Sequence, residues 1–147
     1  MDKTLISRRF AKAVGTYLDK ADVQRYVASR MAELTGRYIP ADVQERVLEI
    51  GCGTGMFTRM YLKQAAPEEM WLNDLCPEVE PYLADVLGGK VHFVAKDAET
   101  LAFPAGQDLI VSCSAVQWFD DLPRFFSGCR KLLHEGGYLA FSTFGPH

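Results

Sequence analysis

The sharpest local signal in the sequence is Val47-Leu48-Glu49-Ile50-Gly51-Cys52-Gly53-Thr54-Gly55. Its first part is mostly apolar, as in a buried strand, and alternating glycines follow before a helical pattern begins. Glycine permits positive φ and lets a ligand approach the backbone, while the first turn of a helix presents free N–H groups. The stretch therefore predicts a strand, a ligand-binding turn and a helix.

The spacing of the glycines limits the choice of ligand. The dinucleotide fingerprint G-x-G-x-x-G would place its third glycine at position 56, where the chain has Met56. The acidic Glu49 lies two positions before the first glycine, where it would repel a pyrophosphate and attract a cation. The turn therefore favours S-adenosylmethionine, whose ammonium and sulfonium groups are cationic; tight packing of strand on helix is the simpler alternative.

Outward from this turn, strand and helix patterns alternate. Apolar runs predict strands over 47–50, 70–72, 91–95, 109–113 and 138–144, and helical patterns predict helices over 55–64, 78–87 and 122–133. Such alternation implies right-handed crossovers and a parallel sheet with helices on both faces. The predicted fold is α/β, a doubly wound Rossmann-like sheet of five parallel strands.

The first 40 residues have a different pattern. Apolar residues recur at helical spacing at Ile6, Phe10, Val14 and Tyr17. A second helix follows, with Gly36 as its expected left-handed stop and Pro40 after it. Residues 1–40 are therefore expected to form a helical arm or lid, and residues 41–147 the core domain.

Two further acidic residues end strands of the predicted sheet. Asp74 closes the second strand, where an acidic residue can accept hydrogen bonds from ribose hydroxyls, although a helix cap is the commoner role. Asp97 and Ala98 follow the third strand, where they could face an adenine ring. The carboxyl ends of parallel strands meet at one edge, so these residues are expected near the glycine turn.

Composition excludes several classes of protein. The 147 residues are 48% hydrophobic and 24% charged, which suits one globular domain and not a disordered chain or a coiled-coil rod. No apolar run reaches the roughly 18–20 residues of a membrane span, and no secretory signal is visible, so a cytoplasmic protein is expected. The net charge of −3, without a basic stripe, argues against nucleic acid as a partner. The cysteines and histidines lack metal-ligand spacing, so free thiols and no metal are expected.

Together these motifs resemble the class I S-adenosylmethionine-dependent methyltransferases over residues 46–145. The resemblance is carried by E-x-G-x-G-x-G, by Asp74, by Asp97-Ala98, and by Gly136-Gly137 before the fifth strand. The segments 6–17 and 112–118 also resemble the malonyl-acyl carrier protein O-methyltransferases of the biotin pathway. Members of that family methylate the free carboxyl of a malonyl thioester.

The resemblance implies a set of site residues. S-adenosylmethionine, converted to S-adenosylhomocysteine, would be bound by Glu49, Gly51, Gly53, Gly55, Asp74, Leu75, Asp97, Ala98, Ser112, Phe10 and Tyr17. Gln117 and Trp118 would face the transferred methyl group, with Phe119 beside them. A carboxylate acceptor is already ionised at neutral pH, so in-line transfer would need no general base. The acidic carrier protein would meet basic residues at Arg8, Arg9, Lys12, Arg25 and Arg30.

The family's sheet has seven strands, and this chain ends after the fifth. The chain is therefore expected to be a fragment that lacks the C-terminal antiparallel hairpin, with its fifth strand exposed as an edge that could support dimerisation. Two other functions stay open: a methyltransferase for another small-molecule acceptor, and a non-catalytic module that binds S-adenosylmethionine. A nicotinamide-dependent oxidoreductase fits the glycine spacing poorly.

Overall fold

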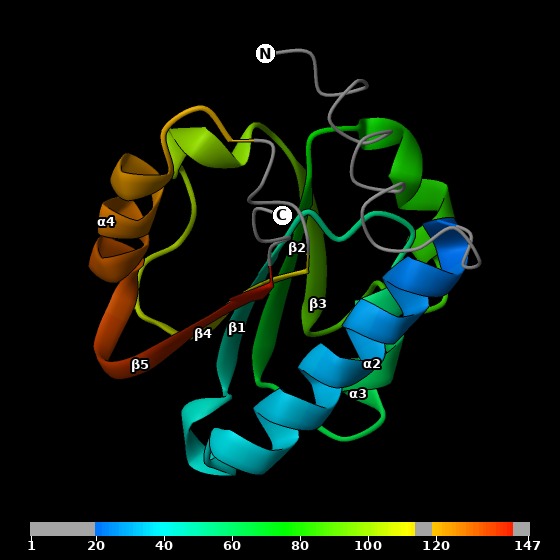
Figure 1. Cartoon of the computed structure of the whole chain (residues 1–147), viewed down its shortest axis with the longest axis horizontal. Coiled ribbons are helices and arrows are strands. Elements are labelled where there is room, and N and C mark those ends of the chain that lie inside the picture. The colour runs from blue at the N-terminus through cyan, green and yellow to red at the C-terminus, as the bar shows by residue number, and fades with distance from the viewer. Residues whose placement is uncertain (1–19, 114–118, 143–147) are drawn as a thin grey trace.

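The computed structural model describes residues 20–113 and 119–142, which contain one five-stranded sheet and the helices packed against it (Figure 1). Every pair of neighbouring strands is parallel, and the strand order is β3-β2-β1-β4-β5. The strands are β1 (Arg46–Ile50), β2 (Glu69–Asp74), β3 (Val91–Ala95), β4 (Gln107–Cys113) and β5 (Leu133–Ser142). The doubly wound α/β fold and its five parallel strands are confirmed.

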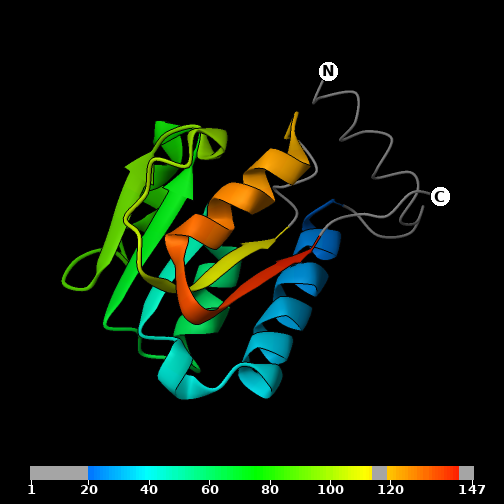
Figure 2. The same cartoon turned by 90° about the vertical axis from the view of Figure 1, so that its left-hand side faces the viewer.

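Helices cover both faces of the sheet, as the right-handed crossovers require (Figure 2). The helices α2 (Lys20–Tyr38) and α3 (Met56–Leu62) lie on one face, and α4 (Leu122–Leu132) lies on the other. Alternate residues of β1 divide between two cores: Val47 packs in the α2 and α3 layer, and Leu48 packs in the α4 layer. Both faces of β1 are therefore buried, which explains its nearly continuous apolar run.

The predicted helix over 78–87 is wrong. The segment instead forms the short 3-10 helix η2 (Pro77–Leu83), which has Pro81 inside it. Proline lacks the backbone N–H that an α-helix needs at this point, and its ring clashes with the preceding turn. A longer α-helix is therefore interrupted, and only Leu83 of η2 is buried.

The predicted stop at Gly36 is also wrong. The helix α2 continues through Gly36 to Tyr38, and Gly36 is absent from the glycines with positive φ. Pro40 does follow the end of the helix, as expected, because a proline disfavours helical backbone in the residue before it. The other predicted helix of the arm, around 6–17, lies outside the described residues.

The strand β5 begins earlier than predicted, at Leu133 rather than at Tyr138. Its pairing with β4 contains an irregularity between Gln107 and Leu109, opposite the segment that contains Gly136 at φ 87°. The strand lies at the edge of the sheet in the order found among the described residues. Along this edge the exposed side chains include Tyr138 and Phe141.

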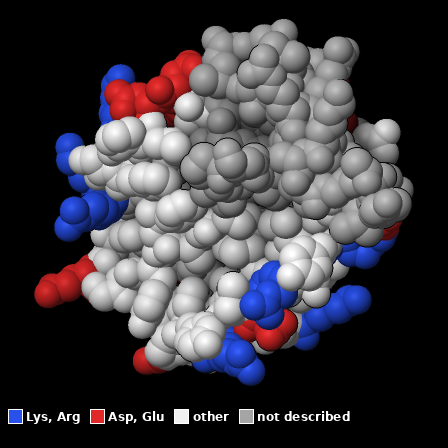
Figure 3. Space-filling model, viewed as in Figure 1, with Lys and Arg blue, Asp and Glu red and all other residues white. Residues whose placement is uncertain are grey.

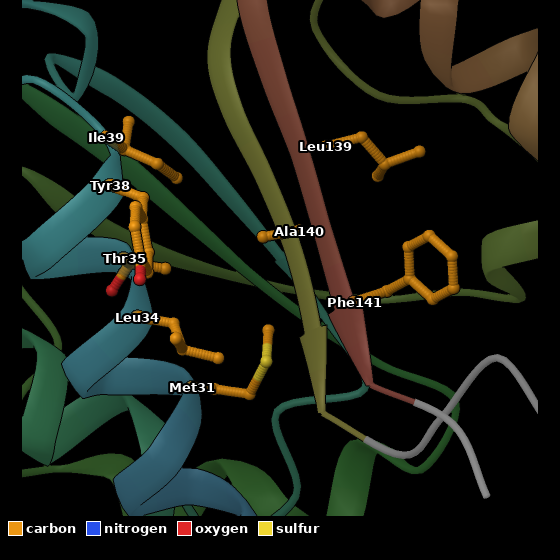
Figure 4. A pocket seen from close by; sticks show the side chains of 8 residues that line it. All are labelled: Met31, Leu34, Thr35, Tyr38, Ile39, Leu139, Ala140 and Phe141. Atoms are coloured by element: carbon orange, nitrogen blue, oxygen red, sulfur yellow. The ribbon is translucent and has the colours of Figure 1, made fainter. Parts of the chain in front are cut away.

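The helix α2 belongs to the same hydrophobic core as the sheet, since its residues Ala28, Met31 and Ala32 pack with Val47 and Leu109. Figure 4 shows an apolar groove between α2 and β5, where Ala140 points toward the helix. The groove is lined by Met31, Leu34, Thr35, Tyr38, Ile39, Leu139, Ala140 and Phe141. None of these residues belongs to the glycine turn. Within 20–113 and 119–142, no helix is long and apolar enough to cross a membrane.

Candidate functional site

The glycine turn follows β1 directly and has the geometry expected of it. Gly51, Gly53 and Gly55 have φ values of 69°, 56° and 93°, in the left-handed region that favours glycine. A Cβ built on Gly53 would meet no atom within 4 Å, whereas one on Gly55 would lie 2.7 Å from the Leu83 Cδ2 atom. Gly53 therefore borders open space that a ligand can enter, and Gly55 permits close packing against η2.

Asp74, at the end of β2, lies against this turn. Its Oδ2 atom accepts a hydrogen bond of 2.8 Å from the Gly53 N–H, and its Oδ1 atom accepts one of 3.0 Å from the Cys76 N–H. The Cys52 N–H also donates to the Asn73 carbonyl at 2.7 Å. The structure thus brings the ends of β1 and β2 together, with a partly exposed carboxylate between them.

Glu49 is buried beneath the turn and is 1% exposed. Its Oε1 atom accepts a hydrogen bond of 2.6 Å from the hydroxyl of Thr58, on α3. Burial raises the pKa of Glu49 from 4.5 to about 7; the hydrogen bond from Thr58 opposes this rise, and the charge of Asp74 adds to it. No Lys or Arg among the described residues forms an ion pair with Glu49. A buried carboxylate without a counter-ion suits a cationic ligand.

The end of β3 completes this edge of the sheet. Asp97 caps the 3-10 helix η3 (Ala98–Thr100), because its Oδ1 atom accepts a hydrogen bond of 3.0 Å from the Glu99 N–H. Ala98 is buried. The Asn73 side chain donates to the Lys96 carbonyl at 2.9 Å, which ties β2 to β3 beside Asp74.

The other predicted site residues differ in their surroundings. Leu75 is exposed, next to Asp74. Ser112 is buried, and its hydroxyl donates to the Ile50 carbonyl at 3.1 Å, so its side chain joins β4 to β1 just before the glycine turn. Phe10, Tyr17, Gln117 and Trp118 lie outside the described residues.

Comparison with known proteins identifies the family. Residues 48–141 match the family described as "Methyltransferase domain". The chain belongs to this methyltransferase domain family. It is 51% identical over 146 residues to a malonyl-acyl-carrier protein O-methyltransferase of Bacteroides thetaiotaomicron, covering 99% of this chain and 56% of that protein. It is 34% identical over 145 residues to the protein of that name from Acinetobacter baylyi, covering 99% of this chain and again 56% of the relative. The chain thus spans about half the length of these curated relatives.

Solved structures agree on the fold of this methyltransferase domain. An S-adenosylmethionine dependent methyltransferase from Mesorhizobium loti superposes with a TM-score of 0.65 at 24% identity, covering 77% of this chain and 52% of that chain. The trans-methyltransferase CalH, solved in complex with SAH, gives a TM-score of 0.64 at 20% identity, covering 80% of this chain and 37% of that one. At these identities the likeness concerns the fold alone.

The methyltransferase domain also holds its site together with a residue that sequence reasoning missed. The Arg59 guanidinium donates to the carbonyls of Thr54, in the glycine turn, and Tyr82, in η2, each at 2.6 Å. It also forms two hydrogen bonds with Asp85, of 2.8 and 2.6 Å, and this contact lowers the pKa of Asp85. Nothing in the local sequence marks Arg59 beyond its place in the last turn of α3, because its partners lie 5 and 23 to 26 residues away.

The residues present fit an S-adenosyl cofactor. The open space over Gly53 would admit the ligand. The buried Glu49 would face an ammonium, and the carboxylate of Asp74 would accept hydrogen bonds from hydroxyls. Among the described residues, no cluster of three or more His, Cys, Asp or Glu side chains could hold a metal ion. Cys52, Cys76, Cys113 and Cys129 are free, as predicted.

Proposed function

We propose that the chain is the S-adenosylmethionine-binding part of an O-methyltransferase that methylates the free carboxyl of a malonyl group on acyl carrier protein, in biotin biosynthesis. The observation that carries the proposal is 51% identity over 99% of this chain to a relative named for that activity. The cofactor supplies an activated methyl group on a sulfonium. A cytoplasmic location and the division into an arm, 1–40, and a core, 41–147, are parts of the same proposal.

In this proposal several residues at the carboxyl edge of the sheet each contact a different part of the cofactor. Glu49 pairs with the ammonium, while Gly51, Gly53 and Gly55 let the backbone approach the methionine part. Asp74, with Leu75 beside it, accepts hydrogen bonds from the ribose hydroxyls. Asp97 and Ala98 border the adenine, and Ser112, Phe10 and Tyr17 complete the set. Support comes from the hydrogen bond of Asp74 with Gly53 and from the burial of Glu49, which has no Lys or Arg counter-ion among the described residues.

The acceptor needs little chemistry from the protein. A carboxylate is ionised at neutral pH, so the protein has only to orient it, exclude water and hold it in line with the sulfonium methyl. Gln117, Trp118 and Phe119 follow β4 and are the proposed positioning residues. Phe119 packs edge-on against Phe125, with ring centroids 4.6 Å apart, which gives this side of the sheet an apolar character. Apolar surroundings favour a reaction in which opposite charges are neutralised.

Basic residues near the start of the chain are the proposed contacts of the acidic carrier protein. Arg25 and Arg30 lie exposed on α2, where they pair with Asp22 and Glu33 at 3.1 Å. These ion pairs partly neutralise the two arginines. Figure 3 shows basic and acidic side chains close together on the face that it views. The proposed contact with the carrier protein therefore depends mainly on Arg8, Arg9 and Lys12. Charge reversal of Arg8 and Arg9 should weaken carrier binding and flatten its salt dependence.

We also propose that the edge strand β5 mediates self-association. Among the described residues β5 is an edge strand, and such a strand presents backbone hydrogen-bonding groups. The side chains of Tyr138 and Phe141 on it are about two-fifths exposed. Sedimentation velocity from about 1 to 100 µM should show a dimer, which Phe141→Lys should weaken. A monomer throughout this range would refute the proposal.

The cofactor site is tested with a matched pair of glycine substitutions. Gly53 and Gly89 have φ of 56° and 59°, and a Cβ on either would meet no atom within 4 Å. Gly53→Ala and Gly89→Ala should therefore lose similar stability, about 1 kcal/mol, while only Gly53→Ala should lose S-adenosylhomocysteine binding in isothermal titration. Equal affinities of the two variants for S-adenosylhomocysteine would mean that the ligand does not bind over Gly53.

The substrate is tested by turnover. The chain is incubated with radiolabelled S-adenosylmethionine and either malonyl-acyl carrier protein or free malonate, and the methyl ester is counted. Label transferred to the carrier-bound malonyl group supports the proposal. Binding of S-adenosylhomocysteine without transfer to either acceptor would instead identify a non-catalytic module.

A further inference from the structure

A buried hydrogen bond beneath the glycine turn is not explained by the packing of the fold. The Thr58 hydroxyl lies 2.6 Å from the Glu49 Oε1 atom, and the two residues are 0% and 1% exposed. Thr58 is the third residue of α3, on the face turned toward the sheet, where an apolar side chain would be the ordinary choice. The helix that follows the turn therefore directs a donor at the carboxylate below it.

The other groups around Glu49 do not replace this donor. Asp74, at the end of β2, is acidic and disfavours a charge on Glu49. Cys52, in the turn, and Cys113, at the end of β4, are thiols whose pKa is raised by burial and by the charge of Glu49, so both remain neutral. Among the described residues, Thr58 provides the hydrogen bond that Glu49 accepts. A hydrogen bond donated to a carboxylate favours its charged form.

We propose that Thr58 is a positioning residue, whose hydroxyl orients Glu49 and favours its ionised form, so that cofactor binding at neutral pH releases a proton and strengthens as pH rises. The inference rests on the proposed function, because it assumes that Glu49 pairs with the cofactor's ammonium. It adds a proton linkage to that site and assigns it to a residue on α3.

The expected size follows from the ionisation of Glu49. Burial sets its pKa at about 7, and only the ionised fraction binds the ammonium well, so affinity should rise about tenfold from pH 6 to pH 8. Thr58→Val removes the donor and keeps the shape of the side chain. If the pKa of Glu49 then rises by about one unit, the variant should bind about ninefold more weakly than wild type at pH 6, about fivefold at pH 7 and about 1.3-fold at pH 8.5.

The experiment is isothermal titration of S-adenosylhomocysteine into the 147-residue wild type, Thr58→Val and Thr58→Ser from pH 6 to pH 8.5. Buffers of different ionisation enthalpy report the protons released, and thermal unfolding checks that each variant is folded. Titration of the ligand itself is common to all three proteins and cancels in the ratio of their affinities. Thr58→Ser keeps a hydroxyl and should restore the pH profile of wild type.

The outcomes separate this inference from the proposed function. A ratio between Thr58→Val and wild type that falls with rising pH, with rescue by Thr58→Ser, supports the inference. A ratio that is constant with pH, or proton release that is unchanged in Thr58→Val, shows that Thr58 only packs and overturns it. Absence of binding by folded wild type at every pH would overturn the cofactor site itself, and the inference with it.

Discussion

Replacing Glu49 by Gln should stabilise the ligand-free protein at alkaline pH. Burial raises the pKa of Glu49 from 4.5 to about 7. The folded state therefore binds a proton more tightly than the unfolded state does. The stability from this group is fully present below pH 4.5 and is lost as pH rises through about 7. Glutamine has the same shape, can still accept from Thr58 and carries no charge to desolvate.

The magnitude follows from these pKa values. Linkage gives a difference in unfolding free energy between Glu49→Gln and wild type that grows by about 2.5 kcal/mol from pH 5 to pH 8.5. Urea denaturation at both pH values measures it, and the urea midpoints should separate by about 1–2 M more at the higher pH. Comparing the two pH values removes any constant effect of the amide on packing.

A control variant guards against a general effect of charge. Glu80→Gln removes a carboxylate from an exposed position on η2. The unfolding free energy of this variant should differ from that of wild type by the same amount at both pH values. If the stability difference between Glu49→Gln and wild type does not grow with pH, burial does not penalise the charge on Glu49 and the prediction is wrong. The same result would remove the argument that a cationic ligand offsets this penalty.

Three further changes test other parts of the structure. Arg59→Ala, which removes the link between Thr54 and Tyr82, should lower the unfolding free energy by about 1 kcal/mol and weaken S-adenosylhomocysteine binding in titration; unchanged binding would show that the turn holds its shape alone. Hydrogen bonding to the Glu135 carbonyl, and to a smaller extent to Asp108, raises the pKa of His134. His134→Gln should therefore remove stability that is present below about pH 6.5 and is lost as pH rises. Urea midpoints of wild type and variant at pH 5.5 and 8 measure this effect. Gly128→Ala places a Cβ 2.0 Å from the Leu101 Cδ1 atom. The unfolding free energy measured by chemical denaturation should fall by about 1–3 kcal/mol, and a rise would contradict the packing of α4.

The sequence-based predictions are wrong where a local pattern is compatible with two backbone conformations. The apolar spacing over 78–87 favours a helix, but Pro81 inside it removes a backbone donor and restricts the segment to the 3-10 helix η2. The sequence predicts that Gly36 ends the helix, yet glycine is tolerated within a helix when tertiary packing compensates its entropy cost. Here Ala32 and Ile39, on either side of it, are buried in the core, and α2 extends to Tyr38.

The order of strands and helices can be predicted from the amino-acid sequence alone, as can the glycine turn and the acidic residues at the strand ends. These features depend on the period of apolar residues and on the backbone freedom of glycine, which are local properties. The hydrogen bond from Thr58 to Glu49 and the link that Arg59 makes between the turn and η2 depend instead on the three-dimensional packing of the chain. The same holds for the burial that raises the pKa of Glu49. Contacts and desolvation of this kind arise when crossovers bring distant segments to one edge of the sheet, so no window of sequence contains them.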